Sequence, residues 1–261
     1  MPGSLYSNTG AKRARDGREA LGCSPDGPLL DLLEVVEDRG GAHAVILELP
    51  DGVAGAYVAK PDLPLLFVNG AQAITRQRFT LAHEFGHSRM GHATVVDEQV
   101  MIGGFQHSPT EVAANAFAAE FLMPKAATKA WAAGHVRGQV TLEHVVRFAH
   151  EYGVSSQAAR YAFTTADVLT DAGRADQLDG EIADDLHVEV AAYLGLEPLA
   201  DRLAEAVRRL PRIPAALEGS ALGDLLIGAI DIHELAARAG RSTEEMEEAL
   251  AEFHLDQLLP L

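Results

Sequence analysis

The residues with the clearest chemical potential are two histidines and a glutamate in the run His83-Glu84-Phe85-Gly86-His87. In a helix, His83 and His87 lie one turn apart on the same face, so both imidazoles can bind one metal ion. Glu84 then projects beside that metal, where its carboxylate can take a proton from a bound water molecule. The preceding segment 76–82 contains neither Gly nor Pro and favours a helix. The pattern H-E-x-x-H therefore predicts a Zn²⁺ site rather than a surface helix that happens to carry two histidines.

A zinc site of this kind needs a third protein ligand and a fourth position for water. The downstream side chains that could supply the third ligand are His92, Asp97, Glu98, His107, Glu111 and Glu120. His92 falls one position short of the spacing H-E-x-x-H-x-x-G-x-x-H. Glu111 and Glu120 stand nine residues apart in a predicted helix over 109–122. They therefore face opposite ways, and only one of them can point at the metal.

Glu111 has two competing interpretations. Ser108, Pro109 and Glu111 form the pattern of a capping box, in which the glutamate reaches back to the start of its helix. The same carboxylate shares its face with Asn115 and could turn toward the histidine helix instead. The small residues between 113 and 119 would let the two helices pack closely. Spacing alone leaves the ligand role and the cap role open.

Two blocks of the chain carry a resemblance to a known family. Their sequences are Arg78-Phe-Thr-Leu-Ala-His-Glu-Phe-Gly-His87 and Glu111-Val-Ala-Ala-Asn-Ala-Phe-Ala-Ala-Glu-Phe-Leu-Met-Pro124. They resemble the signature blocks of the ImmA/IrrE family of bacterial metallopeptidases, and the resemblance extends over about 29–163. It implies Zn²⁺, or another divalent metal such as Mn²⁺, on His83, His87 and Glu111, with Glu84 as the general base. Around these ligands, Asn115 and His92 are the candidate supporting residues, and an oxyanion donor is expected among His92, His107, Tyr57, Tyr152 and Tyr161.

The composition describes an ordinary globular protein of one or two domains, with 261 residues, 48% hydrophobic and 23% charged. No uninterrupted apolar run approaches the roughly 18 residues of a membrane span. The basic N-terminus lacks the apolar segment of a secretory signal. The single cysteine, Cys23, cannot form an internal disulfide. These features predict a cytoplasmic protein that does not contact a membrane.

The elements that position the site follow from hydrophobic periodicity. The first segment, 1–28, is predicted to be a flexible arm because it is rich in Gly, Ser, Pro and like charges. A helix over 29–36, strands over 43–49, 53–59 and 65–69, and the two site helices follow. The predicted fold class is α+β: a zincin-like peptidase core over 29–134, with a small antiparallel sheet and active-site helices, followed by an all-helical C-terminal region. Similar peptidases bind substrate along an edge strand, here either 65–69 or part of 95–106. The segment 94–107 is either a mobile flap or an irregular connector.

The rest of the chain is predicted to be helical. A helix-turn-helix-like segment over 135–165 is predicted to precede an acidic domain over 166–261. The boundary is placed where the net charge changes. Residues 1–165 hold 14 Lys+Arg against 17 Asp+Glu, a net of −3, whereas 166–261 hold 7 against 21, a net of −14. Only Arg147 and Arg160 are cationic in the two helices over 142–163. Packing or partner docking is therefore favoured there over direct nucleic-acid binding. The acidic region is either a solvated surface or a docking surface for a basic partner.

Together these features predict a zinc-dependent endopeptidase. By the family resemblance, its substrate is one specific protein, a helix-turn-helix transcriptional repressor that is cleaved in a stress response or in mobile-element regulation. The alternatives are a non-proteolytic regulator and a toxin-like partner-binding protein on the same metal-binding fold. The presence of Glu84 favours the enzyme, because a binding module needs no general base.

Overall fold

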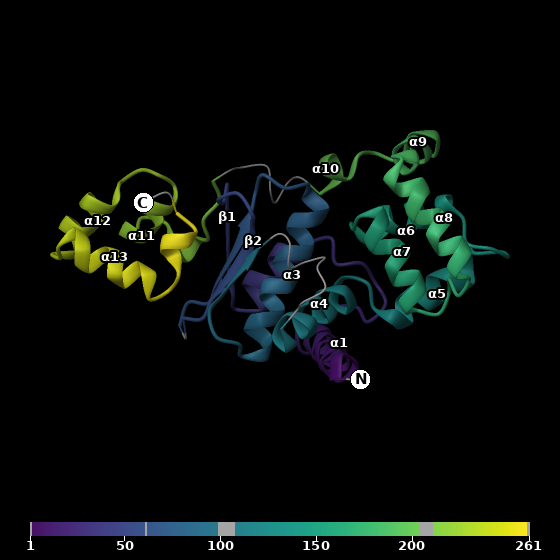
Figure 1. The fold of residues 1–261 in the computed structure, drawn as a ribbon, viewed down its shortest axis with the longest axis horizontal. Helices are drawn as coiled ribbons and strands as arrows, with labels where there is room; N and C mark the ends of the chain where they lie inside the picture. Colours follow the sequence, from purple (N-terminus) through teal and green to yellow (C-terminus); the bar gives the residue numbers. More distant parts are fainter. Residues whose placement is uncertain (1, 61, 99–107, 204–210, 260–261) are drawn as a thin grey trace.

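A four-stranded sheet lies at the centre of the molecule, and helices cover both of its faces (Figure 1). The computed structural model describes residues 2–60, 62–98, 108–203 and 211–259. The strands are ordered β1 (His43–Leu47), β3 (Leu65–Asn69), β2 (Val53–Val58) and β4 (Val95–Glu98). The fold class α+β is confirmed.

The sheet is mixed rather than antiparallel as expected. Strand β3 pairs antiparallel with β2 and parallel with β1. The reason is the strand order: β3 turns back from β2 and inserts beside β1, so it must run in the direction of β1. Strand β4 pairs antiparallel with β2 and forms one edge of the sheet, and β1 forms the other. Because β3 lies inside the sheet, 65–69 is not an edge strand. Strand β4 is the described part of the other candidate segment, 95–106.

Successive residues of the strands enter two different hydrophobic cores. Ala44, Ile46, Leu66 and Val68 pack on the side of the site helices, whereas the alternate residues pack on the side of the C-terminal helices. Every residue of β3 is buried as a result, as is typical of a strand covered on both faces. Before the sheet, the predicted helix over 29–36 forms a short helical segment of α2 (Leu32–Glu34) and one turn of π-helix (Val35–Arg39).

The two site helices, α3 (Ile74–Met90) and α4 (Pro109–Leu122), pack closely in opposite directions. The Phe85 ring lies between two rings of α4, with centroids 6.1 Å from Phe117 and 5.7 Å from Phe121. A Cβ on Gly86 would stand only 3.0 Å from the Phe117 side chain, so the glycine inside the H-E-x-x-H run permits this approach.

The prediction of a flexible arm over 1–28 is wrong. Residues Pro2–Ala20 form helix α1, which crosses α4 (Figure 1). An added Cβ on Gly10 would stand 2.0 Å from the backbone oxygen of Ala113. Arg18 is buried, and its guanidinium donates to the backbone oxygen of Phe121 at 2.6 Å. A small residue of the kind that suggested disorder, Gly10, therefore allows the backbones of α1 and α4 to make contact.

Helices on one flank of the core form a single packed group, coloured teal to green in Figure 1. They are α5 (Lys125–His135), α6 (Leu142–Tyr152), α7 (Ser156–Thr165), α8 (Ala172–Ala183) and α9 (Leu186–Tyr193). The predicted helix, Gly-containing turn and helix over 142–163 is confirmed, with Gly153 at φ 65°. Arg160 of α7 is buried and donates from Nε to Asp179 of α8 at 2.6 Å. The predicted boundary between 165 and 166 therefore cuts through this group, because α8 and α9 pack on α6 and α7.

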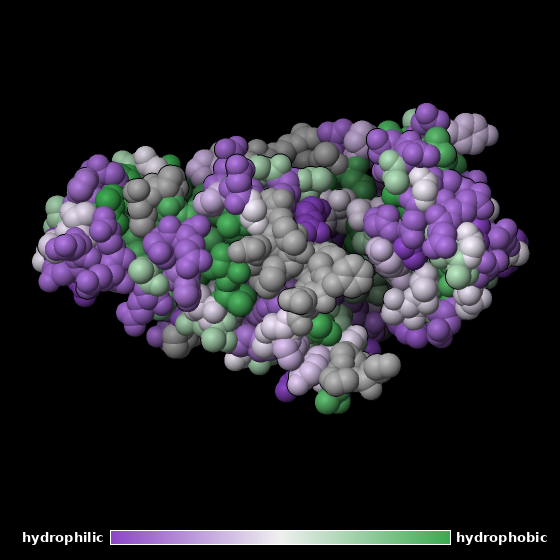
Figure 2. All heavy atoms as spheres, in the orientation of Figure 1, coloured by the Kyte–Doolittle hydropathy of each residue, from purple (hydrophilic) through white to green (hydrophobic). Residues whose placement is uncertain are grey.

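The C-terminal helices cover the face of the sheet opposite to α3. They are α11 (Ala221–Leu226), α12 (Ile232–Ala239) and α13 (Thr243–Ala251), and they follow α10 (Leu199–Arg202) and the residues 204–210, which lie outside the description. Arg212 connects the chain leading to these helices with strand β1. Its backbone pairs with Ile46, and its guanidinium donates to Glu37 and to the backbone oxygen of Ala44. The acidic region over 166–261 is thus divided between two places rather than forming one domain. Both helical ends are largely hydrophilic on the face shown in Figure 2. None of the described helices has the length and apolar character to cross a membrane.

Candidate metal centre

Three buried side chains converge between α3 and α4. Nε2 of His83 lies 3.0 Å from Nε2 of His87 and 3.0 Å from Oε2 of Glu111. The other oxygen, Oε1 of Glu111, lies 3.5 Å from Nε2 of His87. Both histidines are 0% exposed and Glu111 is 3% exposed. The structure therefore brings together the three residues predicted as metal ligands, with one donor atom of each within 4.8 Å of the others.

The donor set fits a divalent metal ion. Zinc–nitrogen bonds of about 2.0–2.1 Å in tetrahedral geometry place neighbouring donor atoms about 3.3 Å apart, close to the separations of His83, His87 and Glu111. Two imidazole nitrogens and one carboxylate oxygen suit Zn²⁺, and such donors also accept Mn²⁺. Three protein ligands leave a coordination position for water or substrate, as in catalytic rather than structural zinc sites.

The structure resolves the two interpretations of Glu111. The Ser108 side chain accepts a hydrogen bond from the backbone nitrogen of Glu111 at 3.3 Å, and Pro109 starts the helix. The Glu111 carboxylate does not close a capping box but turns to the histidines. Backbone and side chain of one residue thus fill separate roles. The other candidate on α4, Glu120, accepts from Arg15 at 2.9 Å and from the backbone nitrogen of Lys125 at 3.2 Å instead.

The electrostatics of the pocket keep Glu111 ionised. Burial alone would raise the pKa of this carboxyl, but hydrogen bonds from His83 and His87, together with the charge of the two imidazoles, lower the pKa far below its ordinary value. A carboxylate that stays charged in a buried place is a strong metal ligand, because it needs no deprotonation on binding.

Two further side chains orient the histidine rings from outside. Nδ1 of His83 lies 3.1 Å from Oδ1 of Asn115 and donates a hydrogen bond to it. With Nδ1 held in this way, loss of the Nε2 proton leaves the Nε2 lone pair for a metal. Nδ1 of His92 lies 2.9 Å from Nδ1 of His87. Gly91 ends α3 at φ 69° and turns the chain so that His92 folds back on the helix. Burial and then the charge of His87 lower the pKa of His92, so that Nδ1 of its neutral ring can accept a hydrogen bond from the Nδ1–H of His87.

Gly55, a residue that the sequence motifs do not single out, packs against Glu84. Glu84 is 0% exposed, and Gly55 of β2 lies against it. An added Cβ at position 55 would stand 2.6 Å from Oε1 of Glu84, 2.5 Å from Cγ2 of Thr80 and 2.7 Å from the backbone oxygen of Phe67. The only signal in the sequence was a glycine inside a strand, which often marks a close approach of another group.

The remaining candidates separate by position. The Tyr57 ring stacks on His87 with centroids 6.5 Å apart, so Tyr57 and His92 are the proposed oxyanion donors nearest the ligands. Tyr152 donates to the backbone oxygen of Asp26 at 3.0 Å and belongs to a different part of the molecule. Tyr161 projects from α7. His107 and most of the segment 94–107, expected to be a flap or a connector, lie in 99–107, outside the described residues.

The comparison with known protein families matches residues 38–164 to the IrrE N-terminal-like domain, family Peptidase_M78. The matched segment contains the sheet, both site helices and every candidate residue of the metal centre. Helix α1 and the helices from α8 onward lie outside it. No curated protein matches the chain at a significant level.

Proposed function

Because the chain belongs to the ImmA/IrrE family of metallopeptidases through its IrrE N-terminal-like domain, we propose that it is a zinc-dependent endopeptidase that cleaves one specific protein. The observation that carries the proposal is the buried convergence of His83, His87 and Glu111. Glu84 follows the first ligand in the chain and is held in the same helix. A donor set with a spare position and an acid beside it is the arrangement used for metal-assisted peptide hydrolysis.

Each residue of the metal centre has a separate role in the proposed hydrolysis. A bound divalent metal would polarise the scissile carbonyl and lower the pKa of a water molecule. Asn115 and His92 hold the Nδ1 atoms of the two histidines, which leaves both Nε2 lone pairs for coordination. The carboxylate of Glu84 accepts a proton from the attacking water and returns it to the nitrogen of the leaving amine.

The proposed substrate is a helix-turn-helix transcriptional repressor that is cut in the cytoplasm during a stress response or in mobile-element control. This assignment rests on the family resemblance. The charge distribution supports it, because a DNA-binding protein carries basic surface, and the segment 166–261 holds a net charge of −14 that attracts such a surface. Strand β4, one of the two edge strands of the sheet, offers an edge along which an extended substrate segment can add.

Direct binding of nucleic acid by the helix-turn-helix-like segment is not proposed. Of the two cations in these helices, Arg160 is 5% exposed and pairs with Asp179, and Arg147 pairs with Glu143 at 2.9 Å. A buried guanidinium with a carboxylate partner has little attraction left for DNA.

The decisive test compares wild type with Glu84→Gln, using the repressor encoded in a neighbouring gene as substrate. We expect the variant to bind Zn²⁺ as wild type does and to cleave the repressor at least about 100-fold more slowly, because it lacks the general base. Glu19→Gln, an exposed change on α1 outside the acidic segment, is the control and should cleave normally. Equal cleavage by Glu84→Gln would show that Glu84 is not the base. Binding of the repressor without cleavage by wild type would instead support the non-proteolytic regulator.

A further inference from the structure

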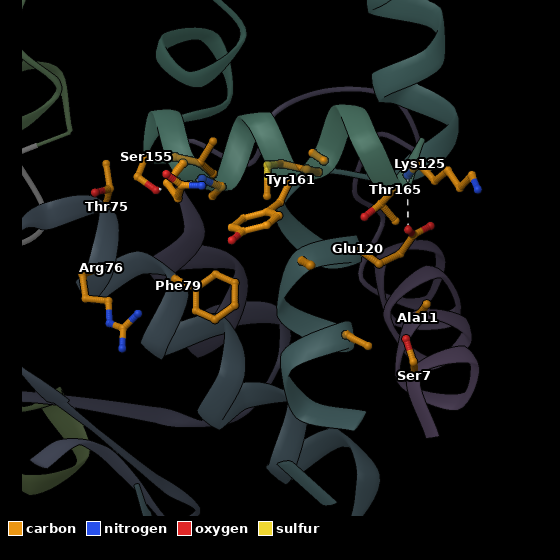
Figure 3. Close-up of a pocket in the computed structure, with 17 residues that line it drawn as sticks. Ser7, Ala11, Thr75, Arg76, Phe79, Glu120, Lys125, Ser155, Tyr161 and Thr165 are labelled. Carbon is orange, nitrogen blue, oxygen red and sulfur yellow. Dashed lines mark hydrogen bonds between the residues drawn. The ribbon is translucent and has the colours of Figure 1, made fainter. Parts of the chain in front are cut away.

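A groove of about 640 Å³ lies between the peptidase core and helix α7 (Figure 3). The groove is lined by residues of α1, α3, α4 and α7. Four of the lining residues are alanines, whose small side chains leave space: Ala116 and Ala119 of α4, and Ala158 and Ala162 of α7. Tyr161 reaches down from α7 toward the ring of Phe79 on α3 (Figure 3). The groove is therefore a mostly apolar hollow with two aromatic side chains inside it.

The groove continues the line of the metal centre along the same two helices. Phe79 stands one turn before His83 on α3, and Ala119 stands one turn beyond Asn115 on α4. With a helical rise of about 1.5 Å per residue, Phe79 lies roughly 6 Å along the axis from His83, and Arg76 lies roughly 10 Å. An extended peptide advances about 3.3 Å per residue. Side chains two or three residues from a scissile bond would therefore enter the groove.

One charged side chain of the groove differs from the others. Glu120 bonds Arg15, and Lys125 pairs with Asp167 at 3.0 Å, so these charges already have partners. The guanidinium of Arg76, within the part of the chain that the structure describes, makes no hydrogen bond or ion pair. Burial lowers its pKa, because the partly desolvated cation gains no compensating charge. A carboxylate from outside would supply that compensation through charge-assisted hydrogen bonds.

Tyr161 is a ready anchor for an apolar group. The residue is 56% exposed, unusually high for a large aromatic residue. The guanidinium of Arg160 lies over the ring, 3.9 Å from its centroid, and is itself held by Asp179. The ring is thus fixed on one side and open on the other, as expected for an aromatic anchor in a binding site.

We propose that this groove is a specificity pocket, in which Phe79 and Tyr161 bind a bulky apolar side chain of the substrate and Arg76 binds an adjacent acidic residue. The inference rests on the proposed proteolysis and names its substrate class. The cleaved segment carries a large apolar residue next to Asp or Glu, within about three residues of the scissile bond.

The binding test uses the Zn²⁺-loaded Glu84→Gln protein and fluorescein-labelled, alanine-based peptides. The peptides carry Phe-Asp, Phe-Lys, Ala-Asp or Ala-Lys at two adjacent positions, in both orders, and anisotropy gives their affinities. We expect the Phe-Asp peptides to bind about tenfold more tightly than peptides with either single change, the effect of losing one good contact. Adding Tyr161→Ala should remove the preference for Phe. Adding Arg76→Glu should reverse the preference from Asp to Lys.

Matched controls separate recognition from folding. Tyr193→Ala removes a tyrosine that is 89% exposed on α9, and Arg137→Glu reverses an exposed charge after α5; neither should alter the preferences. The conservative changes Tyr161→Phe and Arg76→Lys should retain them. Equal affinity for all the peptides, or preferences that survive both Tyr161→Ala and Arg76→Glu, would overturn the pocket.

A cleavage experiment distinguishes this inference from the proposed function. The wild-type holoenzyme acts on a mixture of proteome-derived peptides, and mass spectrometry identifies the cut sites. Cuts without an apolar–acidic preference would refute the pocket and leave proteolysis intact. If neither the peptides nor the repressor is cut while the anisotropy preferences hold, the pocket stands and the proposed proteolysis fails.

Discussion

Gly55 of β2 lies directly on the carboxylate of Glu84 in α3, so closely that a methyl group at position 55 would stand 2.6 Å from Oε1. The same methyl group would stand 2.7 Å from the backbone oxygen of Phe67 in the neighbouring strand. The strand and the helix therefore meet at the one position where β2 has no side chain. This contact holds the proposed general base between the sheet and its own helix.

Replacing this glycine tests whether the contact positions Glu84. In Gly55→Ala, the added methyl group must push either β2 or Glu84 aside, at a cost of about 1–3 kcal/mol for overpacking. We expect cleavage to fall by about tenfold or more, with Zn²⁺ content retained. Gly134→Ala is the matched control, because its Cβ would meet no atom within 4 Å. If Gly55→Ala is as active and as stable as Gly134→Ala, Gly55 does not position the base.

The hydrogen bond between Asn115 and His83 should tune metal affinity. Asn115→Leu removes the acceptor at Oδ1 that orients the imidazole, and outer partners of this kind contribute about 10–100-fold in metal affinity. We expect a loss in that range, measured by competition with a chelator. Asn115→Asp keeps an oxygen at the same place and should keep the affinity near that of wild type. An unchanged affinity in Asn115→Leu would show that the contact only packs the helices.

Lowering the pH should reduce the contribution of Glu111 to the free energy of unfolding of the metal-free protein. The pKa of Glu111 is lower in the folded protein than its ordinary value, so the ionised carboxylate stabilises the fold above the unfolded pKa of about 4.3. That contribution is lost as the pH falls through this value toward the folded pKa. Urea unfolding with a chelator present should therefore show a larger difference between wild type and Glu111→Gln at pH 6 than at pH 3.5. A difference that does not change with pH would contradict the assignment.

Two glycines of α1 provide an internal comparison for the docking of the N-terminal helix. Gly10→Ala would place a methyl group 2.0 Å from the backbone oxygen of Ala113, whereas the nearest atoms to a Cβ on Gly17 are 3.9 Å away. We expect Gly10→Ala to lower the free energy of unfolding by about 1–3 kcal/mol. Gly17→Ala should leave it unchanged or raise it by up to about 1 kcal/mol, because alanine favours a helix. Urea denaturation measures both, and equal stabilities would place α1 away from α4.

The metal ligands show how far local sequence could lead. A helix fixes His83 and His87 on one face at a spacing of four residues, so that pair could be predicted without any tertiary contact. Glu111 could not be assigned by spacing, because the choice between cap and ligand depends on how α4 lies against α3. The family resemblance favoured the ligand role. The close packing of Gly86 against Phe117 brings α4 near enough to α3 for the Glu111 carboxylate to reach the histidines.

The segments outside the two signature blocks show where composition misled. Gly and Ser in 1–28 suggested an arm with little to bury, yet Gly10 lets α1 touch α4. The net charge changes near residue 165, yet the ion pair of Arg160 with Asp179 joins the helices on either side. Charge and composition indicate how strongly a segment is solvated, but they do not indicate which other segment it packs against.

The order of residues along the chain determined the periodic features of this protein: the strands, the pair of histidines on one helix face and the acid next to them, because each depends on neighbours within one turn or one pleat. Tertiary structure decided the rest. The third ligand, the glycine above Glu84 and the groove under Tyr161 arise where β2, α3, α4 and α7 meet, and the distances there depend on side chains that are far apart in the sequence.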